Sequence, residues 1–104
     1  MSVVVVLSTF PSSEKAAELA RQLVDERLCA CVNLVPAVRS IYRWQGQVHD
    51  DAEVLAIVKT TTERVDALRE RLIALHPYEL PEAIVLPVAG GHAPYLAWVT
   101  GEVS

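Results

Sequence analysis

The segment from residue 76 to residue 82, His-Pro-Tyr-Glu-Leu-Pro-Glu, is the part of the sequence best equipped for chemistry. Two prolines stiffen a short loop, which carries an imidazole, a phenol and two carboxylates. A rigid polar loop of this kind can hold a small ligand or a metal ion. It can equally be a stiff helix-to-strand connector, with Tyr78 packed and Glu82 paired to a basic residue. The sequence favours neither of these two interpretations over the other.

Lys59 is the second candidate, because it ends an otherwise apolar predicted strand. An unpaired ammonium group there would cost several kcal/mol, so we expect a carboxylate partner, either Glu53 or Glu82. Tyr78 is expected beside the pair, held by the proline-rich loop. Such a cluster is either a structural ion pair or a binding site for a small anion such as a carboxylate or phosphate compound.

Cysteine and histidine offer weaker metal-binding candidates. Cys29 and Cys31 suit a soft metal ion, but no second thiol pair or histidine pair completes four ligands. Buried free thiols in a reduced, cytoplasmic protein are the favoured interpretation. His49 beside Asp50 and Asp51 is expected at a solvated hairpin tip, with ion binding as the alternative.

Composition and charge exclude several classes of protein. The chain has 104 residues, of which 52% are hydrophobic, so we expect one ordered domain over residues 1–104. Nine basic against 13 acidic residues give a net charge of −4, which argues against nucleic-acid binding. The apolar start lacks a basic region and is too short to be a signal peptide or a membrane span. No phosphate-binding or nucleophile-elbow motif indicates an enzyme.

The elements that would position these residues follow from hydrophobic periodicity. Strands are expected over 3–10, 31–38 continuing at 40–44, 47–60 and 83–88, with an irregularity at Pro36 and a tight turn at Gln45-Gly46. The first helix is expected over 13–27. The second is expected to start at a capping box formed by Thr60 and Glu63 and to end before Pro77. A short third helix is expected to start at Pro94. The first and third strands are apolar throughout, which is typical of strands covered on both faces.

This order predicts an α+β fold of the ferredoxin-like βαββαβ type. Its antiparallel sheet would carry both main helices on one face, with a short C-terminal helix added. A third strand of up to about 46 Å is longer than a domain of about 35 Å, so the hairpin between residues 31 and 60 should overhang. An overhanging apolar strand pair needs cover, and a partner subunit is the simplest cover.

Five stretches of the sequence resemble the CutA family of divalent-cation tolerance proteins: residues 30–36, 40–46, 58–61, 76–82 and 95–98. The resemblance covers nearly the whole chain. It implies a ferredoxin-like protomer similar to the PII signalling proteins. It also implies a tight homotrimer, in which the long hairpin forms sheets between subunits, and a link to tolerance of copper and other divalent metals.

The resemblance also implies site residues. Metal binding in the family involves a first-strand cysteine and a histidine pair before Pro-Tyr, but the matching positions here hold Ser8 and Leu75. His76 alone is retained, which implies weak binding of Cu(II) or another divalent cation there. The family's intersubunit cleft is implied to be lined here by Trp44, Glu53, Lys59, Tyr78 and Glu82.

The expected function is a trimeric, non-enzymatic protein of divalent-metal (copper) tolerance or response, which binds metal ions or a small ligand. The alternative is a PII-like small-ligand-binding signalling protein. A ferredoxin-like enzyme such as an acylphosphatase is less favoured, because the loop at residues 10–13 lacks the arginine that would cradle a phosphate. The expected partners are further copies of the chain and a metal ion or small anion, with neither nucleic acid nor membrane.

Overall fold

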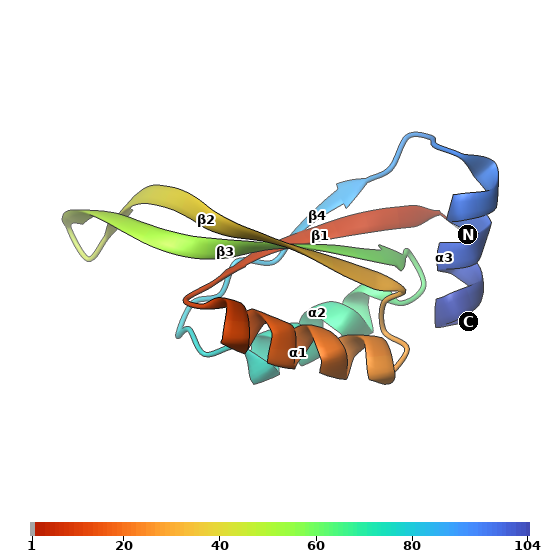
Figure 1. Ribbon diagram of the computed structural model, residues 1–104, viewed down its shortest axis with the longest axis horizontal. Helices are drawn as coiled ribbons and strands as arrows, with labels where there is room; N and C mark the ends of the chain where they lie inside the picture. Colours follow the sequence, from red (N-terminus) through yellow and green to blue (C-terminus); the bar gives the residue numbers. More distant parts are fainter. Residues whose placement is uncertain (1) are drawn as a thin grey trace.

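The chain forms its strands and helices in the predicted order (Figure 1). The computed structural model describes residues 2–104. The elements are β1 (Val3–Phe10), α1 (Ser13–Asp25), β2 (Cys31–Trp44), β3 (Gln47–Thr61), α2 (Val65–Leu75), β4 (Ile84–Pro87) and α3 (Ala93–Val103). The longest helix, α1, has 13 residues, and within the described range no helix is long and apolar enough to cross a membrane.

The strands form an antiparallel sheet in the order β2-β3-β1-β4. β1 lies between β3 and β4, with Val3 opposite Thr61 and Phe10 opposite Val54. The helices α1 and α2 both lie on one side of the sheet, and α3 lies beyond one end of it (Figure 1). The predicted ferredoxin-like arrangement is therefore confirmed.

Alternation along the strands separates a buried sheet face from an open one. Val6, Ala56 and Val58 point towards the helices and pack with Leu23 and Leu72, each at most 2% exposed. The opposite face keeps half-buried or exposed apolar side chains: Val5, Leu7, Leu55, Ile57, Ile84 and Leu86. The prediction that β1 and β3 are covered on both faces is wrong for a single chain, because α1 and α2 cover only one.

The hairpin of β2 and β3 has the predicted turn and the predicted overhang. Gln45 and Gly46 have φ angles of 50° and 80°, as a two-residue turn of right-handed twist requires. A bulge interrupts the pairing between Val35 and Val38, beside Pro36, as expected from the proline. The hairpin extends far past the helices (Figure 1) and gives the molecule dimensions of 44 × 25 × 21 Å.

One helix start is confirmed and the other is wrong. The Ser12 hydroxyl accepts the Lys15 N–H at 3.2 Å and caps α1. The predicted capping box of Thr60 and Glu63 does not form, because pairing with β1 keeps the chain extended through Thr61. The Thr60 hydroxyl donates instead to the Leu28 carbonyl at 2.6 Å, and α2 begins later, without a side-chain cap.

Candidate functional site

The loop between α2 and β4 is fastened to the sheet by His76. His76 is 8% exposed, and its ring stacks on Phe10, with ring centres 4.4 Å apart. Nδ1 accepts the Tyr78 backbone N–H at 3.0 Å, so Nε2 carries the proton and donates to the Thr9 carbonyl at 2.8 Å. The imidazole therefore joins the loop to the end of β1.

These contacts contradict the prediction that His76 is a metal ligand. Both ring nitrogens are already hydrogen-bonded, so neither offers a lone pair to a cation. Burial lowers the pKa of His76, which keeps the ring neutral in this role. Within residues 2–104, no three His, Cys, Asp or Glu side chains lie close enough together to hold a metal ion. The residues present do not fit a resident metal centre at this position.

Tyr78 connects the same loop to the hairpin. Its hydroxyl donates to Glu53 Oε2 on β3 at 2.6 Å, across 25 residues of sequence. Burial and then this hydrogen bond raise the pKa of Tyr78, so the phenol stays protonated and Glu53 stays the acceptor. His76 and Tyr78 together hold the loop between β1 and β3.

A half-open cavity of about 630 Å³ lies between the hairpin and this loop. Its walls come from β1, the outer part of the hairpin and the loop; the residues are Thr9, Ser40, Ile41, Tyr42, Trp44, Glu53, Tyr78, Glu79, Leu80 and Glu82. We call this cavity the acidic groove, because its lining includes carboxylates but no Lys, Arg or His. The structure thus brings together four of the five predicted cleft residues: Trp44, Glu53, Tyr78 and Glu82.

Lys59 lies outside the acidic groove. Its ammonium donates a hydrogen bond to Asn33 Oδ1 on the neighbouring strand. Glu53 is six residues away along β3, or about 20 Å at ~3.3 Å per residue. Glu82 precedes β4, and the ion pairs found within residues 2–104 include neither carboxylate with Lys59. The predicted pairing is wrong within one chain. Strand order determines which strands are adjacent, but the register determines which residues lie opposite each other along those strands.

The lining of the acidic groove in the single chain does not favour a small anion. Glu82 has no hydrogen-bond or ion-pair partner among the described residues. Burial and then the charge of Glu53 raise the pKa of Glu82. A negative ligand would meet the same repulsion, without a basic residue in the lining to offset it.

The other metal candidates are already engaged or buried. Asp50 accepts two hydrogen bonds from Arg39, at 2.9 and 2.6 Å, and the Tyr42 hydroxyl donates to Asp51 at 2.5 Å. His49 stacks on Tyr42, with ring centres 5.3 Å apart. These contacts agree with the predicted hairpin tip rather than an ion site.

Both cysteines are free thiols, as predicted. Cys29 is buried in the core, and Cys31 is half-buried with its Sγ 3.9 Å from the Lys59 ammonium. Neither belongs to a ligand set within the described residues.

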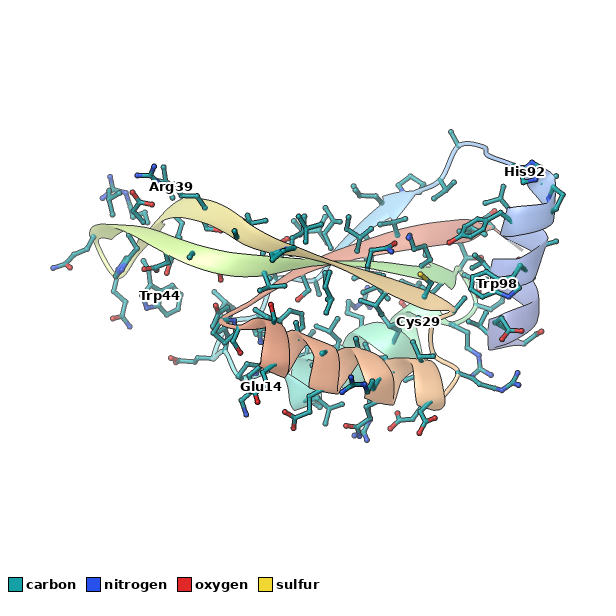
Figure 2. All side chains as sticks on the ribbon, viewed as in Figure 1. Glu14, Cys29, Arg39, Trp44, His92 and Trp98 are labelled. Atoms are coloured by element: carbon teal, nitrogen blue, oxygen red, sulfur yellow. The ribbon has the colours of Figure 1, made fainter. Side chains whose placement is uncertain are left out.

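Sequence reasoning missed part of the lining, including Ser40 and Tyr42. Both precede Trp44 on β2 at two-residue spacing, so all three share one face of the strand. That spacing is the signal that would have found them. Figure 2 shows Trp44 near the outer end of the hairpin, far from Trp98 on α3 at the opposite end of the molecule.

Comparison with known proteins agrees with this fold. The family model described as "CutA1 divalent ion tolerance protein" matches residues 4–102. The divalent-cation tolerance protein CutA of Thermus thermophilus is 56% identical over 95 residues, covering 91% of this chain and 92% of that protein. Human protein CutA is 47% identical over 98 residues, which cover 94% of this chain but only 55% of the human protein.

Solved structures give the same result. The crystal structure of CutA from Xylella fastidiosa superposes with a TM-score of 0.96 at 42% identity, covering all of both chains. The Thermus thermophilus structure gives 0.94 at 52% identity, covering 98% of this chain and 99% of that one. The chain therefore belongs to the CutA1 family of divalent ion tolerance proteins.

Proposed function

We propose that this protein serves divalent-metal tolerance or response as a homotrimer that binds a small ligand without transforming it. The observation that carries the proposal is the acidic groove, whose two walls are joined by the hydrogen bond from Tyr78 to Glu53. Ligand sites in proteins are commonly concave and preformed, with volumes of about 300–1,000 Å³. The acidic groove has these properties.

Two features favour binding over catalysis. The Tyr78 phenol is committed to Glu53, and the neighbouring imidazole of His76 has both nitrogens engaged, so neither is a ready acid or base. The acylphosphatase alternative lacks support, since the link from β1 to α1 consists of Pro11 and Ser12.

The donor groups favour a PII-like binding role over storage of a metal ion. Relatives are named for divalent-cation tolerance, yet His76 is not free to coordinate copper. In our proposal, Cu(II) or another divalent cation binds only weakly, through carboxylates, and the link to metal tolerance acts through the ligand of the groove.

The open sheet face supports self-association. Ile84 and Leu86 on β4 are 49% and 43% exposed, beside half-buried apolar residues of β1 and β3. Contiguous apolar surface of this kind is usually covered by a partner. A second copy of the chain would cover it, and the family resemblance supports an assembly of three copies. We place the protein in the cytoplasm, where free thiols such as Cys29 and Cys31 persist.

Sedimentation equilibrium at micromolar concentration tests the assembly. We expect about three times the 11.4 kDa chain mass. Leu86→Glu should dissociate the trimer, because it places a charge on the open face. Val24→Glu is the matched control: Val24 is 42% exposed, but it lies on α1. A monomeric wild type, or equal behaviour of the two variants, would contradict this assembly.

Native mass spectrometry followed by denaturation tests the binding role. We expect a small organic molecule to be released from the purified trimer, and Trp44→Ala to lose it. Release of stoichiometric metal alone would instead make the protein a metal store and contradict the proposal.

A further inference from the structure

We infer that the acidic groove binds an organic ammonium ion, held against the rings of Tyr42, Trp44 and Tyr78 by the carboxylates of Glu53 and Glu82. This inference rests on the proposed binding function and adds the charge and chemical class of the ligand. Three observations carry it: the aromatic walls, the uncompensated negative charge and the poor fit to a bare metal ion.

The aromatic walls come from two elements. Tyr42 and Trp44 stand on one face of β2 at two-residue spacing, and Tyr78 reaches in from the loop. In the single chain Trp44 is 37% and Tyr42 41% exposed, and both side chains contribute surface to the groove. The face of an aromatic ring attracts a cation within about 6 Å, and tryptophan does so most strongly. Several rings around one cavity are the arrangement by which proteins recognise alkylated ammonium groups.

The negative charge of the acidic groove has no positive partner in the groove lining. Three acids elsewhere do have one: Asp50 pairs with Arg39 at 2.6 Å, Asp66 with Arg69 at 3.1 Å and Glu26 with Arg71 at 2.9 Å. In the acidic groove, Glu53 receives one tyrosine hydroxyl, and Glu82 has no hydrogen-bond or ion-pair partner among the described residues. The raised pKa of Glu82 has the same cause, since burial and a like charge both penalise its ionised form. A bound cation would remove that penalty.

The walls suit a bulky organic cation better than a metal ion. A divalent metal needs several oxygen, nitrogen or sulfur ligands converging at about 2–2.6 Å. No such cluster of three exists within residues 2–104, and the Tyr78 hydroxyl already donates to Glu53. Apolar side chains of Ile41 and Leu80 also line the cavity, which at about 630 Å³ far exceeds one ion. Apolar and aromatic walls with separated carboxylates match a diffuse, weakly hydrated charge.

The chain's two tryptophans make the test direct. Trp98→Phe leaves Trp44 as the only tryptophan, at the groove, while Trp44→Phe leaves Trp98 on α3 (Figure 2). Choline chloride is titrated into each full-length variant and followed by fluorescence, with NaCl added to keep ionic strength constant. The neutral isostere 3,3-dimethyl-1-butanol is the matched ligand control.

We expect saturable quenching or enhancement in Trp98→Phe and none in Trp44→Phe. The neutral isostere should bind at least about tenfold more weakly, since it lacks the cation–π and charge attraction. Measured by calorimetry, Glu82→Gln should weaken choline binding about three- to tenfold. Glu14→Gln, an exposed carboxylate on α1, should leave it unchanged.

Each other outcome overturns the inference. Equal binding of choline and its neutral isostere would remove the role of charge, and tighter binding of a phosphate or dicarboxylate would reverse its sign. Either result leaves the proposed binding function standing. Tighter, Glu82-dependent binding of Cu(II) would replace the organic cation by a metal. Absence of any ligand from the assembled protein would overturn both this inference and the proposed function.

Discussion

Replacing His76 by alanine separates a structural imidazole from a metal-binding one. The side chain makes two hydrogen bonds, at 2.8 Å to the Thr9 carbonyl and 3.0 Å from the Tyr78 N–H, and stacks on Phe10. Each hydrogen bond contributes about 1 kcal/mol and the aromatic contact about 0.5–1.5 kcal/mol. We therefore expect His76→Ala to lower the free energy of unfolding by about 3 kcal/mol. For a domain of this size, that corresponds to a fall in Tm of roughly 12–20 °C.

The assay is urea unfolding of wild type and variant at one fixed protein concentration, since the proposed assembly would make stability concentration-dependent. His92→Ala is the matched control, because His92 is exposed and makes no side-chain bond at the start of α3. It should change stability by less than about 0.5 kcal/mol. Calorimetric titration of Cu(II) into the same proteins should show no loss of affinity in His76→Ala beyond that caused by unfolding.

The pH dependence gives a second check on the same imidazole. Burial lowers the pKa of His76 in the folded state, so the unfolded chain takes up this proton first as the pH falls. The stability contributed by the neutral ring is therefore present above about pH 6.5 and is lost below it. The difference between wild type and His76→Phe should shrink across that range. Unchanged stability together with lost copper binding in His76→Ala would refute the structural role.

Two further predictions concern ionisable groups. Glu82→Gln should stabilise the unliganded protein at pH 7 by about 0.5 kcal/mol or more. The pKa of Glu82 is raised in the folded protein, so ionisation of this carboxyl group above about pH 4.5 opposes folding. Urea unfolding should show this gain disappearing at pH 4 and absent in Glu14→Gln; an equal gain at both pH values would contradict it. Burial raises the pKa of Cys29 to about 12, so iodoacetamide at pH 8 should leave this thiol unmodified until denaturant is added. Peptide mapping that finds native Cys29 alkylated would show that the core opens there.

Local patterns predicted the fold well because each has a local physical cause. The turn at Gln45-Gly46 requires two positive φ angles, and glycine adopts one readily. Pro36 lacks an N–H and lies at the bulge for that reason. The capping box failed because a distant strand competed for the same residues: β1 holds Thr61 in the sheet. No local propensity contains that information.

The site was predicted only as far as residue type and strand order allow. Tyr78 and Glu53 meet across 25 residues, and His76 finds Thr9 across 67, through contacts that depend on exact register. Strand order suggested Lys59 as a neighbour of Glu82, but the pairing of Lys59 with Val5 puts it at the other end of β1 from Thr9. One step of register moves a side chain to the other face, so such errors are large.

The contrast between His76 and Glu82 carries the functional argument. His76, retained where the family metal pattern is otherwise replaced by Ser8 and Leu75, has every polar atom satisfied and so acts as structure. Glu82 is the opposite case: a partly buried carboxylate near a second one, with no cation in the groove lining to offset it. Folding alone does not favour that arrangement, and glutamine would remove the repulsion. Proteins retain such unfavourable local interactions mainly where ligand binding offsets them. In our proposal the ligand binds in the acidic groove, and a positive charge is the first property to look for.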